Sequence, residues 1–149
     1  MKASKFFTEE QQAQILAAVK EAENETSGEI RVHIETFCRE DVLDRAAWIF
    51  KKLGMHSTAE RNGVLFYLAI SDKKFAVIGD AGINSKVPVG FWDDVKELLQ
   101  ENFRSGRFTE GLSDGIILAG THLKKHFPHR KDDVNELPDE ISFDKLKGD

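Results

Sequence analysis

The chain has 149 residues, of which 40% are hydrophobic, and it carries 21 Lys and Arg against 26 Asp and Glu. This size and composition suit one domain with a single core, and the net charge of −5 disfavours a nucleic-acid partner, which requires a basic surface. Its one cysteine, Cys38, excludes an intrachain disulfide, and the first residues lack the apolar stretch of a signal peptide, so we expect a cytoplasmic protein. Since no apolar run approaches the roughly 20 residues that cross a bilayer, we expect no membrane partner.

The N-terminal part predicts a helix, a strand and a second helix. Thr8, with a glutamine three residues later, has the pattern of a capping box and begins a helix that ends before Ser27. Residues 29–35 alternate strictly between apolar and polar side chains, which is typical of a strand with one buried face. We therefore expect His33 at the surface unless that face is covered. A helical period returns over residues 40–53.

The following part predicts a hairpin and two more helices. Residues 64–70 are apolar without alternation, as in a central strand that is covered on both faces. A short polar turn leads to a strand at 75–78, so these two strands form an antiparallel hairpin. Helical periods occupy 91–103 and 109–127. We predict an α/β fold, a three-layer α/β/α sandwich whose small mixed sheet has helices on both faces.

The chain divides into one domain, residues 1–128, and a C-terminal tail, residues 129–149. The tail holds seven acidic and four basic residues and few apolar ones. Such a composition favours an extended or partly disordered segment. Leu137, Ile141 and Phe143 are the side chains able to pin it to the domain.

One edge of the predicted sheet gathers polar residues. A right-handed crossover makes strands 29–35 and 64–70 parallel, so their starts meet the end of strand 75–78. The residues at this edge are Ser27, Gly28, Glu29, Arg61, Asn62, Gly63, Gly79, Asp80 and Gly82. Carboxylates, an amide and a guanidinium together suit a hard cation or an oxyanion.

Several segments resemble the TPM domain family. They are residues 26–32, 61–65, 78–83 and 103–112, and they include Asn-Gly-Val-Leu at the start of the central strand and Gly-Asp-Ala-Gly after the hairpin. The resemblance is to short bacterial members without a signal peptide or membrane helix. It implies an α/β/α sandwich, divalent-cation binding as in some members, and an acid-phosphatase assignment as in thylakoid-lumen members. Other members are linked to photosystem repair or receptor assembly, but the transit and anchor segments of the thylakoid members are missing here, so we expect no photosystem role.

The resemblance and the glycine-flanked turn make Asp80 the leading candidate metal ligand, for Ca²⁺ or Mg²⁺. The alternative is an Asx turn that ends the strand. Glu29 is either a second carboxylate ligand or an exposed charge at a strand end. Asp93 and Asp94 either join the metal site or stabilise the start of the following helix through its dipole.

Arg61 and Asn62 are candidate anion-binding residues, and the alternative for Arg61 is a structural ion pair with Glu29 or Asp80. His56 lies in a loop with no partner readable from the sequence. Metal-dependent hydrolysis of a phosphomonoester needs an in-line nucleophile, and no phosphatase signature supplies one. We therefore rank divalent-cation binding first, acid-phosphatase-like hydrolysis second, and an assembly or scaffold role with a protein partner third.

Overall fold

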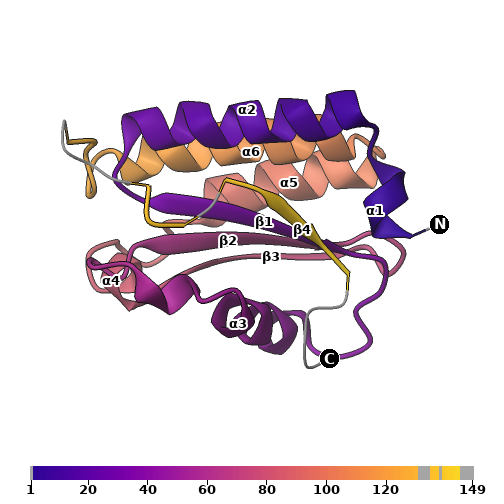
Figure 1. Cartoon of the computed structure of the whole chain (residues 1–149), viewed down its shortest axis with the longest axis horizontal. Helices are drawn as coiled ribbons and strands as arrows, with labels where there is room; N and C mark the ends of the chain where they lie inside the picture. The colour runs from indigo at the N-terminus through magenta and orange to yellow at the C-terminus, as the bar shows by residue number, and fades with distance from the viewer. Residues whose placement is uncertain (1, 131–134, 138, 145–149) are drawn as a thin grey trace.

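A four-stranded mixed sheet lies at the centre of the protein, in the order β3-β2-β1-β4 (Figure 1). The computed structural model describes residues 2–130, 135–137 and 139–144. The strands are β1 (Glu29–Glu35), β2 (Gly63–Ala69), β3 (Lys74–Gly79) and β4 (Ile141–Phe143). β1 is parallel to β2 and β3 is antiparallel to β2, which confirms the predicted strand directions and the hairpin.

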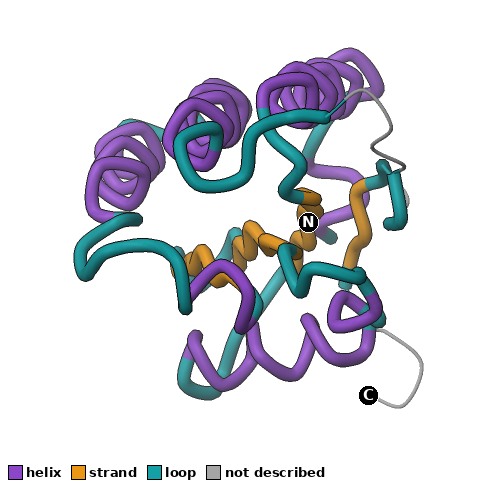
Figure 2. The backbone as a smooth tube through the Cα atoms, turned by 90° about the vertical axis from the view of Figure 1, so that its left-hand side faces the viewer, coloured by secondary structure: helices purple, strands orange, loops and turns teal. Residues whose placement is uncertain are grey.

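Helices cover both faces of the sheet, which confirms the predicted three-layer α/β/α sandwich (Figure 2). One face carries α2 (Glu9–Glu25), α5 (Asp93–Arg104) and α6 (Phe108–Leu123). The other face carries α3 (Val42–Lys52), which continues into the 3₁₀ turn η1 (Met55–Ser57). These four long helices are the predicted ones. Two four-residue helices, α1 (Ala3–Phe6) and α4 (Ala81–Asn84), add to them.

The start of α2 follows its sequence signal. Thr8 accepts a hydrogen bond from the Gln11 N–H at 3.1 Å, and the Gln11 side chain accepts one from the Thr8 N–H at 2.9 Å. This reciprocal pair is the predicted capping box. It satisfies two backbone donors that a helix leaves without a partner at its N-terminus.

β2 divides the hydrophobic core into two halves. All seven of its residues are buried, as the uninterrupted apolar run predicted. Its even-numbered side chains pack with α2, α5 and α6, and its odd-numbered side chains pack with α3. The period of two along a strand therefore gives each side of the sheet its own core.

β1 differs from its prediction, because all seven of its side chains are buried and not only one face. The polar face was expected in solvent, yet α3 and the C-terminal segment cover it. His33 is 0% exposed, so its expected surface position is wrong. Alternating charges are the pattern of a solvated face, but here each charge has a partner from a distant part of the chain.

The C-terminal segment supplies much of this cover. β4 lies parallel to β1, with Ile141 opposite Val32 and Phe143 opposite Ile34. Leu137 is buried in the core half that contains α3. The predicted pinning is thus observed, and it adds a fourth strand that apolar periodicity did not predict. The remaining tail residues, 131–134, 138 and 145–149, lie outside the described residues.

Polar side-chain contacts also join the C-terminal segment to β1. Arg31 Nη2 donates to Glu140 Oε1 at 3.1 Å, and His33 Nδ1 lies 2.7 Å from Ser142 Oγ. These partners are separated by 109 residues in sequence. The polar face of β1 therefore recognises the C-terminal segment by specific side-chain pairs.

Carboxyl groups meet where α2, β1 and the C-terminal segment come together. Glu23 Oε2 accepts from the Ile30 N–H at 3.0 Å, and Glu29 Oε1 accepts from the Leu137 N–H at 2.7 Å. Burial, reinforced by a hydrogen bond with Asp139, raises the pKa of Glu23 to about 9. Burial also raises the pKa of Glu29 to about 7. The fold therefore favours the protonated form of both groups.

We expect the free energy of unfolding to fall as pH rises from about 4.5, the ordinary Glu value, through 7 and towards 9. Stability falls with rising pH because each raised pKa means that the folded state binds its proton more tightly than the unfolded state does. This stabilising contribution is lost as the group ionises in its buried site. Glu23→Gln keeps a neutral side chain and should flatten the decline, whereas Glu21→Gln, exposed on the same helix, should not. Urea unfolding midpoints across this pH range measure the effect, and equal slopes for the two variants would contradict it.

Candidate functional site

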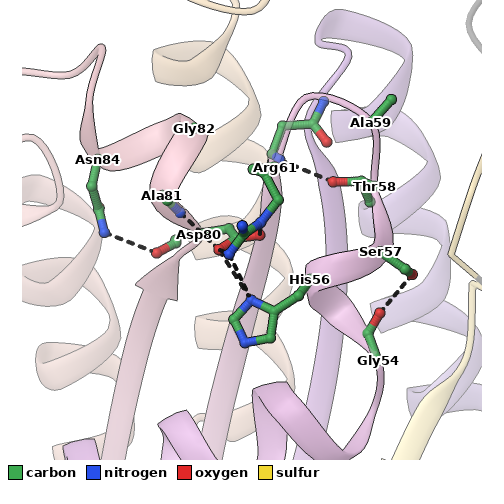
Figure 3. A network of polar contacts seen from close by, with 12 residues as sticks. Gly54, His56, Ser57, Thr58, Ala59, Arg61, Asp80, Ala81, Gly82 and Asn84 are labelled. Atoms are coloured by element: carbon green, nitrogen blue, oxygen red, sulfur yellow. Dashed lines mark hydrogen bonds and ion pairs between the residues drawn. The ribbon is translucent and has the colours of Figure 1, made fainter.

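Asp80 and Arg61 form the centre of the predicted polar edge (Figure 3). Asp80 directly follows β3 and is the N-cap of α4. Arg61 Nε donates to Asp80 Oδ2 at 2.6 Å, Arg61 Nη2 donates to Oδ1 at 2.7 Å, and the Ala81 N–H donates to Oδ1 at 2.7 Å. The Asp80 side chain is 2% exposed and that of Arg61 is 46% exposed. A buried carboxylate is thus paired with a guanidinium that reaches solvent.

Electrostatics keep Asp80 ionised. Burial by itself raises the pKa of this carboxyl, but hydrogen bonds from Arg61, Ala81 and His56 outweigh burial and hold the pKa below its ordinary value. Asp80 is therefore a carboxylate at neutral pH, which is the form that a cation needs.

His56 is a third member of this cluster, and the sequence showed no sign of it. Its Nδ1 lies 3.2 Å from Asp80 Oδ1 and 3.0 Å from Arg61 Nη2. Gly54, with φ of +69°, precedes the η1 turn that carries His56. The imidazole ring of His56 packs against the ring of Phe50, with 4.8 Å between the ring centroids. Because the partner carboxylate comes from the end of β3, no local motif could have linked it to His56.

Close backbone contact holds the loop before β2 against α4. The Gly82 N–H donates to the Arg61 carbonyl at 2.9 Å. A Cβ at residue 82 would lie 2.0 Å from the Glu60 carbonyl oxygen, so only glycine fits there. On the other side of the loop, Thr58 Oγ1 accepts from the Asn62 N–H at 3.1 Å. These contacts position Arg61, whose φ of +51° is left-handed, opposite Asp80.

The structure places the other predicted residues elsewhere. Glu29 contacts the C-terminal segment, and Asn62 Nδ2 donates to the Ser27 carbonyl at 2.9 Å. Asp93 and Asp94 lie in the first turn of α5, where Asp94 Oδ2 is 3.5 Å from His122 Nε2. Arg61 pairs with Asp80 and not with Glu29. Within the described residues, no group of three or more His, Cys, Asp or Glu side chains is placed to hold a metal ion.

Ca²⁺ and Mg²⁺ differ in how many protein oxygen atoms they usually need. Ca²⁺ in an all-protein cage takes about six to eight oxygen ligands, commonly including several carboxylates, and Asp80 has no such carboxylate cluster around it among the described residues. Mg²⁺ commonly binds through one or two carboxylates and keeps several of its waters. Asp80 is one such carboxylate, 2% exposed itself but beside the half-exposed side chains of His56 and Arg61.

A second polar network, also missed by sequence reasoning, lies between β1 and α3. Arg45 Nε and the Tyr67 hydroxyl donate to Glu35 Oε1 at 2.9 Å and 2.5 Å. His33 Nε2 lies 3.3 Å from Glu35 Oε2. Burial by itself raises the pKa of Glu35, but these partners lower it to about 2. Glu35, His33 and Tyr67 are each at most 4% exposed, and the Arg45 side chain is 15% exposed, so we interpret the network as structural.

None of the helices described in this structure combines the length and apolarity needed to cross a bilayer. Comparison with curated proteins gives no match.

Comparison with protein families and solved structures identifies the domain. The family model described as TPM domain matches residues 1–121. The NMR structure of BA42 protein from the psychrophilic bacterium Bizionia argentinensis is 48% identical, covers 93% of this chain and 95% of its own, and superposes with a TM-score of 0.88. Two further NMR structures share the fold. The N-terminal domain of a P. gingivalis protein has 18% identity, covers 85% of this chain and 83% of its own, and has a TM-score of 0.69. The N-terminal domain of cg2496 protein from Corynebacterium glutamicum has 9% identity, covers 91% of this chain and 80% of its own, and has a TM-score of 0.64. With most of its length matched by the family model, this chain belongs to the TPM domain family.

Proposed function

We propose that this domain binds a divalent cation, Mg²⁺ or Ca²⁺, at Asp80, and that the cation competes with Arg61 for the carboxylate. The observation that carries the proposal is the difference in exposure within the pair, 2% for Asp80 against 46% for Arg61. Because the guanidinium is already half in water, it can move away from Asp80 while the carboxylate stays in its site.

The chemistry of the donors supports this proposal. Carboxylate and carbonyl oxygens are the ligands that Mg²⁺ and Ca²⁺ prefer. Asp80 is already ionised, and the Glu60 carbonyl lies in the backbone turn packed against Gly82. With one carboxylate and a resident competing cation, we expect weak binding, on the order of 10⁻³ M.

Competition predicts opposite effects for two substitutions. Arg61→Gln removes the competing charge and should tighten cation binding by about fivefold, which corresponds to an ion pair worth about 1 kcal/mol. Asp80→Asn removes the ligand and should abolish binding. Titration of ¹⁵N-labelled protein with MgCl₂ or CaCl₂ measures both, through the amides of residues 56, 61–63 and 79–82.

Asp94→Asn is the matched control, because Asp94 is an exposed carboxylate on α5 and its loss should leave the titration unchanged. An amide response that persists in Asp80→Asn would overturn the proposal, as would no response at several millimolar cation. Weaker binding by Arg61→Gln would overturn the competition between Arg61 and the cation.

Phosphomonoester hydrolysis is the second candidate, and the placement of His56 favours it. His56 and Arg61 are both about half exposed beside Asp80, so they can offer a proton donor and a phosphate ligand. The neighbouring hydroxyls are engaged in the loop: Ser57 donates to the Gly54 carbonyl and Thr58 accepts from the Asn62 N–H. Release of phosphate from p-nitrophenyl phosphate that is lost in His56→Ala, with cation binding intact, would favour the enzyme. No release would favour binding alone.

A further inference from the structure

The turn between β2 and β3 lies at the opposite end of the sheet from α4, which begins at Asp80 (Figure 1). A second candidate site lies beside this turn. It is a cavity of about 260 Å³. Phe75 lines it near the start of β3, whereas Asp80 follows the end of that strand, about 16 Å away at the usual rise of a strand. The two sites therefore share no residue and are separate in space.

The wall of the cavity is apolar. It is formed by Leu68, Phe75, Phe103 and Phe108. Phe103 packs edge-to-face on Phe75 and stacks on Phe108, each at 5.4 Å between ring centroids. Leu68 is 1% exposed, while the three phenylalanines are partly exposed and form the sides. The rings come from β3, α5 and α6, so three separate elements hold this wall in place.

The rim of the cavity is cationic. Lys73 from the hairpin turn and Arg104 from the end of α5 line it together with the neutral Gln100, and all three are exposed. Among the described residues, no acidic side chain lines the cavity, and neither Lys73 nor Arg104 makes a side-chain hydrogen bond or ion pair. The adjacent acid, Asp72, accepts from the Cys38 N–H at 2.7 Å and lies 3.8 Å from Arg39. Within the described part of the chain, two positive charges without an acidic partner thus lie at one apolar opening.

We propose that this cavity binds a small amphipathic anion, with an aromatic ring or short acyl chain against the phenylalanines and a carboxylate or phosphate facing Lys73 and Arg104. The volume sets the size of the apolar part. A cavity of about 150 Å³ accepts benzene, and drug-sized ligands need about 300 Å³ or more, so one substituted ring or a chain of about six carbons fits.

Lys73 offers a test that separates binding from folding. Its φ is +54°, a left-handed conformation that glycine adopts without a steric penalty. Lys73→Gly therefore removes the charge and suits the backbone. We expect its melting temperature to equal or exceed that of the unmodified chain while it binds the anion more weakly.

The experiment is an NMR titration with a matched set of probes. We expect 3-phenylpropionate, hexanoate and phenyl phosphate to shift the amides of residues 68, 73–75, 100–104 and 108. Two control probes each lack one half of the recognised chemistry: inorganic phosphate has no apolar part, and 3-phenylpropanol has no negative charge. The anion should bind at least about tenfold more tightly than the alcohol, as expected for one charge-assisted contact. Whichever of phenyl phosphate and 3-phenylpropionate binds more tightly shows whether the cavity prefers a phosphate or a carboxylate.

Three variants complete the test. Lys73→Gly combined with Arg104→Gln should abolish the tenfold preference for the anion, and Gln100→Trp, which fills the mouth of the cavity from an exposed helix position, should weaken both probes. Lys51→Gln, on α3 across the sheet, is the charge-matched control and should change neither the preference for the anion nor the affinity for either probe. Equal affinity for 3-phenylpropionate and 3-phenylpropanol would overturn the proposal. Shifts that survive in Gln100→Trp, or that map to residues 56–63 and 79–82, would also overturn it.

Discussion

Glu35→Ala should lower the free energy of unfolding by about 3–5 kcal/mol, the usual effect of removing one partner from a buried ion pair. Glu35 is 4% exposed and accepts hydrogen bonds from Arg45 and Tyr67. Its loss leaves a largely buried guanidinium and a buried hydroxyl without the acceptor that they share. Urea unfolding at neutral pH measures the change.

A double-mutant cycle tests the same network. In the Glu35→Ala background, Tyr67→Phe should cost less than it does alone, because it removes a hydroxyl that has already lost its acceptor. Glu21→Ala, at an exposed position of α2, is the control and should change stability by less than about 0.5 kcal/mol. A Glu35→Ala effect no larger than this control would show that the network does not stabilise the fold.

Gly82→Ala should lower the free energy of unfolding by about 1–3 kcal/mol or more, since over-packing typically has a cost in this range. The new Cβ would lie 2.0 Å from the Glu60 carbonyl oxygen and 2.6 Å from that of Arg61. Both obstacles are backbone atoms, which cannot rotate away as a side chain does. We therefore expect the loop before β2 to move away from α4, with loss of the Gly82 to Arg61 hydrogen bond and separation of Arg61 from Asp80.

Gly28→Ala is the matched control at the same edge of the sheet. The nearest atom to a Cβ there is Leu123 Cδ1 at 3.4 Å, an ordinary contact, so its cost should be much smaller. Urea unfolding gives the stability of each variant, and the chemical shifts of Arg61 and Asp80 report their separation. Equal stability of the two variants would contradict the close packing of Gly82.

Much of the architecture follows from local pattern. The capping box of α2, the apolar run of β2 and the short turn into β3 were each readable, because local backbone preference and side-chain periodicity decide them. The burial of β1 was not readable. Its odd-numbered residues have the pattern of a solvated face, and only the covering by α3 and the C-terminal segment makes them interior.

The candidate site shows the same division. The antiparallel hairpin of β2 and β3 brings residues 61–63 beside residues 79–82, so the topology alone predicted the edge that holds Arg61 and Asp80. It did not predict that Glu29 contacts Leu137 or that His56 joins Asp80. Strand order decides which segments meet, whereas the packing of side chains decides which groups touch.

The sequence by itself determined the fold class, the hairpin and the edge of the sheet where Asp80 lies, because short-range periodicity and chain connectivity suffice for these. The tertiary structure alone decided the partner of each charge. Asp80 is paired with Arg61, Glu35 is enclosed by Arg45 and Tyr67, and the polar face of β1 is covered from a segment 109 residues away. Such pairings depend on burial and on distances between remote segments, and neither quantity is encoded in a local pattern of residues.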